Sequence, residues 1–154
     1  MSMYVILEVN EVKFALTCDL VGEVFRLEPV TAIPSDVKYI AGVLQRREQV
    51  LTVIDLHRRL GLGRFAPTKD SRLVEAHVDG IPLGLQVDRV LAVDVLGRQM
   101  QEEGAGDLVD SPFIKEMAQW NGGLVFVLTP QSIINKSIMM QDPEWQAAQA
   151  EYGS

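Results

Sequence analysis

Residues Tyr39 to Leu62 read YIAGVLQRREQVLTVIDLHRRLGL, and this stretch contains the main signals that decide the fold. Two short apolar runs, Ile40 to Leu44 and Val50 to Ile54, have the composition of β-strands. A charged segment separates them, which predicts a turn between a pair of strands. The following residues, Asp55 to Gly61, predict one or two helical turns with Asp55 as the N-cap and Gly61 as the stop.

Similar apolar runs recur along the rest of the chain with turn residues between them, a pattern typical of an all-β sandwich or barrel. Asp79-Gly80 and Asn121-Gly122 supply the positive φ angles that tight hairpin turns need. The sequence therefore predicts an all-β fold with few helices. Further strands are expected at residues 4–9, 12–17, 21–27, 73–78, 81–87, 113–120 and 124–128.

The organisation of the chain follows from its weakly apolar segments. The stretch 64–72 divides the strands into two groups of about five, and residues 99–111 predict an exposed loop. We expect one domain over residues 1–136, with two lobes that divide near 64–72, and a C-terminal extension over 137–154. Residues 130–134 predict a single helical turn, and the tail that contains Trp145 and Tyr152 predicts a helix. This tail could dock on its own barrel or on a partner, and we favour its own barrel.

Composition excludes several classes of protein. The 154 residues are 47% hydrophobic and carry 21 acidic against 14 basic side chains, for a net charge of −7. This hydrophobic content excludes disorder, and the acidic balance is unsuited to nucleic acid. The sequence begins without a signal peptide, and no apolar run approaches the roughly 20 residues that span a bilayer, so a cytoplasmic protein is expected. Cys18 is the single cysteine, which excludes an intrachain disulfide and a Cys-based zinc site and predicts a small hydrophobe.

Few residues suggest catalysis. His57 and His77 lack partners at metal-ligand spacing, and Asp55 and Asp88 follow strands where an aspartate usually caps the next turn. The chain contains no phosphate-binding glycine loop, nucleophile elbow or zinc-protease helix. We therefore favour a non-catalytic binding module with no cofactor and no metal. A small-molecule-binding or enzymatic barrel that uses Asp55, Asp88 and His77 is the alternative from another class.

The segment 39–62 resembles the signature of the CheW family, the adaptors of bacterial chemotaxis arrays. The family pattern there contains Gly-Val, then Asn-Leu-Arg-Gly, then Pro-Val-Ile-Asp-Leu-Arg. Three other segments resemble family segments in the expected order: Val21 to Val24 with the Pro29 to Pro34 loop, Gly84 to Val93, and Leu124 to Leu128. The resemblance covers the chain from Tyr4 to about Ile134.

The resemblance implies two five-stranded SH3-like or OB-like barrels with a further hydrophobic core between them. It also implies a cytoplasmic adaptor, monomeric when isolated, that joins a chemoreceptor's cytoplasmic tip to the regulatory domain of the histidine kinase CheA. The family's receptor-facing residues correspond here to Val21, Glu23 and Arg47. With their neighbours, the candidate partner-binding residues are Val21, Glu23, Val24, Arg46, Arg47 and Glu48.

The residues themselves leave simpler interpretations open. Val21 could pack in the core, Glu23 could pair locally, and Arg47 could be a solvated charge at a turn. The family's Asn-Leu-Arg-Gly has become Gln45-Arg46-Arg47-Glu48, and its later proline and glycine have become Thr52 and Glu116. If the glycine position needs a positive φ, Glu48 costs about 1 kcal/mol. A diverged module with an altered loop at 45–48, acting in surface motility, pilus or second-messenger control, is the second functional hypothesis.

Overall fold

The computed structural model describes residues 2–97, 99–100, 111–135 and 142–152. Its elements are mainly strands, and the expected all-β class is confirmed. In chain order they are β1 (Tyr4–Val9), β2 (Val12–Thr17), η1 (Cys18–Leu20), β3 (Val21–Arg26), β4 (Ile40–Arg46), β5 (Gln49–Asp55), α1 (Leu56–Leu60), β6 (Arg72–Val78), β7 (Ile81–Val87), β8 (Arg89–Asp94), β9 (Gln99–Met100), β10 (Ile114–Trp120), β11 (Gly123–Leu128), η2 (Pro130–Ser132) and α4 (Pro143–Tyr152).

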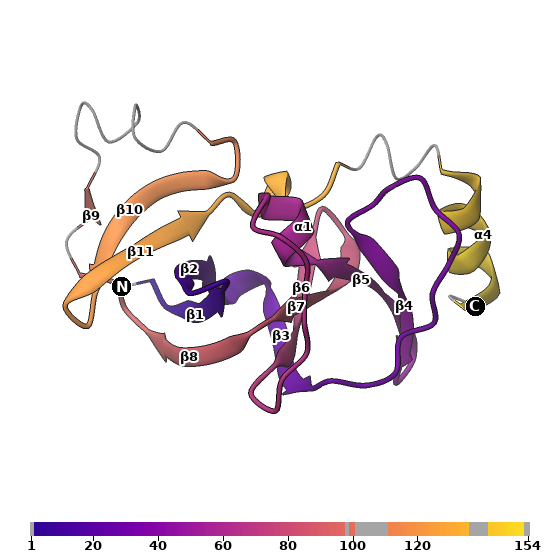
Figure 1. Ribbon diagram of the computed structural model, residues 1–154, viewed down its shortest axis with the longest axis horizontal. Coiled ribbons are helices and arrows are strands. Elements are labelled where there is room, and N and C mark those ends of the chain that lie inside the picture. Colours follow the sequence, from indigo (N-terminus) through magenta and orange to yellow (C-terminus); the bar gives the residue numbers. More distant parts are fainter. Residues whose placement is uncertain (1, 98, 101–110, 136–141, 153–154) are drawn as a thin grey trace.

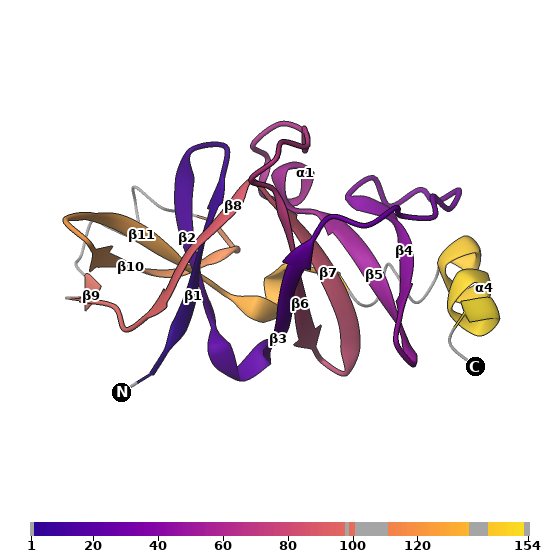
Figure 2. The same cartoon turned by 90° about the horizontal axis from the view of Figure 1, so that it is seen from below.

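The strands form two curved sheets that lie side by side along the long axis of the molecule (Figures 1 and 2). The six-stranded sheet has the order β8-β1-β2-β11-β10-β9, and the five-stranded sheet has the order β3-β6-β7-β5-β4. Most neighbours are antiparallel, but β2 pairs in parallel with β11, and β5 pairs in parallel with β7. These two pairings join segments that are far apart in the sequence.

The division expected near residues 64–72 does not separate the two sheets. This stretch connects α1 to β6, and β6 pairs with β3 inside the five-stranded sheet. The chain crosses between the sheets at η1 and again at Asp88, between β7 and β8. Strand β7 confirms the strand expected at 81–87, while the rest of the family-like segment 84–93 belongs to β8 in the other sheet. An apolar run shows that a strand is buried but not which sheet it joins, which is why the sequence misled here.

Three of the four hydrophobic clusters in the described residues lie inside the two sheets and between them. One lies inside the six-stranded sheet and includes Ile6 and Val125, and another lies inside the five-stranded sheet and includes Phe25 and Leu51. The third combines residues of both sheets, such as Leu7, and is the expected shared core. Strands such as β1 are thus buried on both faces, which explains why their sequences are continuously apolar instead of alternating.

The hairpin turns follow their sequences closely. Asp79-Gly80 has φ angles of 50° and 80°, and Asn121-Gly122 has 50° and 79°, which is the type I′ pattern expected for both. The β4–β5 turn is different, because Arg47 has φ of 59° while Glu48 is outside the positive-φ region. The expectation that Glu48 carries the backbone strain is therefore not met, and the strain falls on Arg47.

The helical expectations are confirmed. The Asp55 side chain accepts a hydrogen bond from the Arg58 backbone N–H at 3.2 Å, and Gly61 ends α1 with φ of 73°. The short turn η2 forms near Pro130, and α4 forms in the tail, where Trp145 is only 6% exposed. The tail thus packs on its own chain, although the Tyr152 side chain lies outside the described residues.

The loop expected at residues 99–111 begins differently from the expectation, because Gln99–Met100 pairs with β10 as the short strand β9. Residues 101–110 of that loop lie outside the described residues. Among the helices of the described segments, none has the length and apolar character needed to cross a bilayer.

Candidate functional site

A cluster of charged side chains lies where the β4–β5 turn meets β3. One carboxylate, that of Glu23, contacts both neighbouring arginines: Oε1 lies 3.1 Å from Nη2 of Arg46, and Oε2 lies 3.1 Å from Nη2 of Arg47. Strands β3 and β4 are the two edges of the five-stranded sheet. The cluster therefore joins these edges and closes the sheet around its inner core.

Arg46 belongs to the interior of this closed sheet. It lies opposite Gln49, two residue pairs beyond Leu44 and Leu51, and therefore on the same face as these two side chains of the inner core. Its guanidinium sits 3.6 Å from the centroid of the Phe25 ring and also pairs with Glu28. The Arg46 side chain is only 18% exposed. The guanidinium is thus committed to contacts within the chain, which favour a structural role for this residue.

Arg47 has the opposite character. Its side chain is 77% exposed, whereas that of its partner Glu23 is 39% exposed. Glu48, next in the turn, is also exposed. A guanidinium is a planar fork of N–H donors that matches a carboxylate or carbonyl oxygen. The turn therefore exposes the N–H donors of the Arg47 guanidinium to solvent, and the ion pair with Glu23 restrains the position of this group. The interpretation of Glu23 as a locally paired residue is confirmed.

The two candidate valines lie away from this cluster. Val24 is 37% exposed and lines a hollow of about 550 Å³ together with residues of β8, such as Arg89 and Leu91. This hollow is also lined by Asp70, Arg72 and Val90, so it lies between the two sheets. Val21 is half-buried and packs against the shared core. The structure thus groups Glu23, Arg46, Arg47 and Glu48, and leaves Val24 in a neighbouring hollow and Val21 in a packing role.

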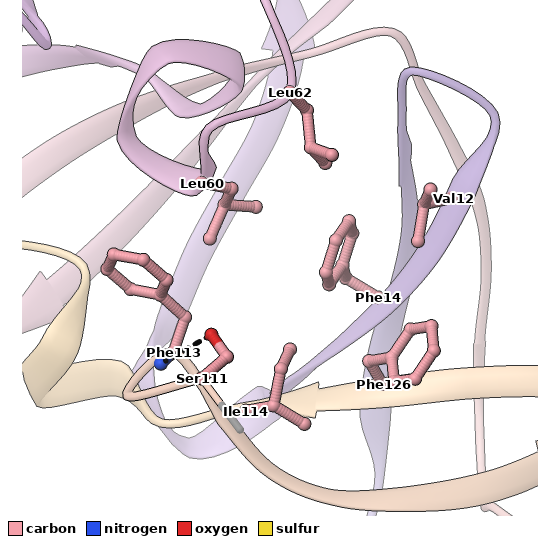
Figure 3. Close-up of a pocket in the computed structure, with 8 residues that line it drawn as sticks. All are labelled: Val12, Phe14, Leu60, Leu62, Ser111, Phe113, Ile114 and Phe126. Carbon is pink, nitrogen blue, oxygen red and sulfur yellow. Dashed lines mark hydrogen bonds between the residues drawn. The ribbon is translucent and has the colours of Figure 1, made fainter. Parts of the chain in front are cut away.

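A second, apolar hollow of about 200 Å³ lies on the opposite side of the sheet interface, next to α1 (Figure 3). Figure 3 shows side chains from β2, from the end of α1 and from the β10–β11 hairpin around the same open space. The lining residues are Val12, Phe14, Leu60, Leu62, Ser111, Phe113, Ile114 and Phe126. The sequence did not single out this hollow, because its apolar residues have the same spacing as ordinary core residues.

Three of the four groups considered for catalysis come together, because the His57 ring lies between Asp88, 2.9 Å from its Nε2, and Asp55, 3.8 Å from its Nδ1. His77 lies apart from them. His77 pairs with Glu75 of the same strand at 3.0 Å, while Asp55 caps α1. Asp88 does not cap a turn as expected, because its Oδ2 binds the His57 ring and accepts the backbone N–H of Asn10 at 2.7 Å. Within the described ranges, no three His, Cys, Asp or Glu side chains are grouped in a way that suits a metal ion.

The chain is similar to known proteins over most of its length. A family model for the CheW-like domain matches residues 3–137. A probable chemotaxis protein CheW from Rhizobium etli is 34% identical over 82 residues, or 53% of each chain. The chemotaxis protein CheW of Thermotoga maritima is 28% identical over 86 residues, or 56% of each chain. These two alignments thus span about half of each relative.

Two longer matches extend over most of the chain. The chemotaxis protein CheW of Bacillus subtilis is 24% identical over 135 residues, or 86% of each chain. The crystal structure of the scaffolding protein TtCheW from Thermoanaerobacter tengcongensis superposes with a TM-score of 0.76 at 24% identity, covering 87% of this chain and 88% of that one. That similarity establishes the same fold. The family model covers far more than half of the chain, so the chain belongs to the CheW-like domain family.

Proposed function

We propose that this chain couples the cytoplasmic tip of a chemoreceptor to the regulatory domain of a CheA-type histidine kinase in the cytoplasm. The observation that carries the proposal is the exposed guanidinium of Arg47, restrained by Glu23 at a closed edge of the five-stranded sheet. A restrained side chain loses less conformational entropy when a partner binds it. The turn is therefore suited to bind a carboxylate or a helix-terminal carbonyl of a receptor.

The receptor-facing surface in this proposal consists of Glu23, Arg47 and Glu48, with Val24 at its margin. Arg46 supports it from inside by holding Glu23 in place. Val21 contributes through packing and not through contact with the receptor. The six residues taken from the sequence thus separate into a contact group and a support group.

The kinase-facing surface in this proposal is the free edge of the six-stranded sheet at β8. Val93 on this strand is 56% exposed, and among the described strands β8 pairs with β1 alone. An edge strand with an exposed apolar side chain suits the addition of a partner's strand or loop. Two separate weak contacts of this kind add up when many copies are arranged in one array.

The test is a calorimetric titration of the full chain against the receptor tip and, separately, the kinase regulatory domain from the same genome. We expect micromolar binding to both. Arg47→Gly should abolish receptor binding without unfolding the protein, because glycine suits the φ of that position. Val93→Lys should weaken kinase binding alone. Arg64→Glu, an exposed charge reversal in the α1–β6 connection, should change neither affinity.

The other outcomes are equally informative. Binding to the kinase alone would contradict the receptor-facing part and favour the diverged module, with the change located at Gln45 to Glu48. Binding to neither partner would overturn the proposal. Receptor binding that survives Arg47→Gly would show that the β4–β5 turn is not the contact surface.

A further inference from the structure

One of the chain's two histidines is buried where the two sheets meet. The side chain of His57 is 5% exposed, its Nε2 lies 2.9 Å from Oδ2 of Asp88, and its Nδ1 lies 3.8 Å from Oδ1 of Asp55. Asp55 ends β5 of the five-stranded sheet, whereas Asp88 lies where the chain crosses from β7 to β8 of the other sheet. The imidazole ring is therefore placed between two carboxylates at the junction of the sheets.

The two ring nitrogens of His57 differ in their bonding. Nε2 forms a hydrogen bond with Asp88, whereas Nδ1 is buried and has no hydrogen-bond partner among the described residues. A neutral imidazole carries one N–H, and since a carboxylate only accepts, this proton belongs on Nε2. Nδ1 of the neutral ring is then a buried acceptor that faces a second acceptor, the Asp55 carboxylate. A buried polar atom left in this state costs free energy.

Protonation of the ring supplies the missing donor. The imidazolium carries a second N–H, on Nδ1, and a positive charge between the two carboxylates. The distance of 3.8 Å to Asp55 suits an ion pair but is more than about 0.5 Å too long for a hydrogen bond. Asp55 is held in place, because its two oxygens accept the backbone N–H groups of Arg58 and Phe65 at 3.2 and 3.1 Å. The movement that closes this gap therefore falls on the ring and on Asp88, which is bonded to it.

A movement of Asp88 reaches the six-stranded sheet directly. Its Oδ2 accepts the backbone N–H of Asn10, in the β1–β2 turn, at 2.7 Å. Its own backbone N–H donates to the carbonyl of Glu8, on β1, at 2.9 Å. The His57 ring thus connects the fixed Asp55 of one sheet to a residue that is bonded twice to the other sheet.

The other charged groups at this junction do not titrate in the same pH range. Arg58 of α1 lies 3.5 Å from Asp55, and Arg89 of β8 lies 3.7 Å from Glu8 and 3.5 Å from Asp70. Arg59 of α1 donates to the backbone carbonyls of Ser132 and Ile133. Arginine and carboxylate side chains ordinarily keep their charge between about pH 5 and 8, where histidine changes its charge. Among the described side chains of the junction, a change of charge in this range therefore falls on His57.

This histidine also departs from the pattern that its segment resembles. That pattern continues from Ile-Asp-Leu to arginine, whereas here Ile54, Asp55 and Leu56 are followed by His57. Arginine stays charged at any physiological pH, but histidine does not. At this position the sequence thus has a pH-dependent cation in place of a permanent one.

We propose that His57 is a pH-sensitive joint between the two sheets. At acidic pH the imidazolium binds both Asp55 and Asp88 and draws Asp88 toward the five-stranded sheet, whereas the neutral ring binds Asp88 alone. Val90, two residues beyond Asp88, lines the hollow between the sheets together with Val24 of β3. Protonation therefore changes the relative position of the two walls of this hollow. The joint belongs to the chain itself and does not depend on the receptor or kinase proposed above.

The test is NMR spectroscopy of the full chain between about pH 5 and 8. The Hε1 signal of the His57 ring gives the titration midpoint. The amide signals of Asn10 and Phe65, which donate to the two carboxylates, should shift with the same midpoint. Residual dipolar couplings should give different relative orientations of the two sheets at the two ends of this range. His77→Gln is the matched control, since His77 pairs with Glu75 on its own strand, and it should leave all these changes in place.

Two variants fix the charge at position 57. His57→Gln keeps a donor for Asp88 and should hold the sheets in the alkaline orientation at both ends of the pH range, whereas His57→Arg should hold them in the acidic orientation. The amide signals of Asn10 and Phe65 should titrate in neither variant. Their titration in His57→Gln would overturn the proposal, as would a ring that does not titrate or a single orientation of the sheets in wild type. Should His57→Arg not fold, wild type and His57→Gln alone decide the question.

Discussion

The imidazole Nε2 of His57 lies 2.9 Å from Oδ2 of Asp88, and this pair links the two sheets by a side-chain contact next to α1. His57 belongs to α1, directly after the five-stranded sheet's β5, and is 4% exposed. The same Asp88 oxygen accepts the backbone N–H of Asn10, in the β1–β2 turn of the six-stranded sheet. The Asn10 side chain in turn donates to the Leu62 carbonyl at 3.2 Å.

Loss of this carboxylate should destabilise the fold. Asp88→Ala leaves the buried His57 ring and the Asn10 N–H without their shared acceptor, so we expect a loss of about 1–3 kcal/mol in the free energy of unfolding. Urea unfolding followed by circular dichroism measures it. Asp88→Asn keeps one acceptor oxygen and should lose less. An Asp88→Ala variant as stable as wild type would show that the pair does not stabilise the sheet interface.

Gly42 should tolerate no side chain. A Cβ built there would lie 2.2 Å from the Thr31 carbonyl oxygen, and that backbone is fixed because Thr31 and Val43 exchange two hydrogen bonds of 2.9 Å. Gly42→Ala should therefore lose about 2–4 kcal/mol or fail to fold. Gly61→Ala is the matched control, since φ is 73° there but nothing lies within 4 Å, and it should lose only about 1 kcal/mol. Equal losses in thermal or urea unfolding would contradict the steric explanation.

Arg47 should contribute little to stability. Its φ of 59° disfavours a residue with a Cβ, and its ion pair with Glu23 is largely exposed. Arg47→Gly removes a strain of about 1 kcal/mol and an ion pair worth about 0–1 kcal/mol, so the free energy of unfolding should change by less than about 1 kcal/mol. A larger loss in the free energy of unfolding, measured with urea, would mean that both Arg46 and Arg47 are needed for the charged cluster to stabilise the fold.

Arg46 should behave in the opposite way. Arg46→Met keeps most of the apolar stem over Phe25 but removes the cation between Glu23 and Glu28. We expect a loss of about 1–3 kcal/mol, since the Arg46 side chain is largely buried and its partners lose their shared cation. Urea unfolding measures this loss, and Glu28→Gln in the Arg46→Met background should recover part of it. If Glu28→Gln restores no stability, the stabilising effect of Arg46 comes from its contact with Phe25 and not from its charge.

Local features of this fold could be predicted from sequence, whereas long-range pairings could not. The turns at Asp79-Gly80 and Asn121-Gly122 and the cap at Asp55 depend on neighbouring residues, and all three are confirmed. The choice of sheet for β6 and β8 depends on pairings with distant strands. An apolar run alone carries no sequence signal for that choice, whether the strand is largely buried, as β6 is, or partly exposed, as β8 is.

In the candidate site, too, the sequence predicted which residues take part but not which distant residues they contact. Arg46 and Arg47 are adjacent, and the sequence predicted both as contact residues. Only the β4–β5 register shows that Arg46 shares the face of Leu44 and points toward the Phe25 ring. The His57–Asp88 pair was likewise hidden, because 31 residues separate the two side chains. The packing of Trp145 on its own chain was predicted, but its acceptor Thr52, 93 residues away, was not.

The single thiol should react slowly. Partial burial of Cys18 in η1 raises the pKa of the thiol, and the neighbouring negative charge of Asp19 raises it further. The thiolate is the reacting form, so at pH 8 a smaller fraction of Cys18 is reactive than of free cysteine, and alkylation by iodoacetamide should be slower. The rate should rise with pH and reach half its maximum at a higher pH than for free cysteine. Asp19→Asn removes the negative charge, which is the smaller of the two causes. The pH dependence of alkylation of this variant should therefore move toward that of free cysteine without reaching it. A wild-type profile that coincides with free cysteine would contradict the burial of this thiol.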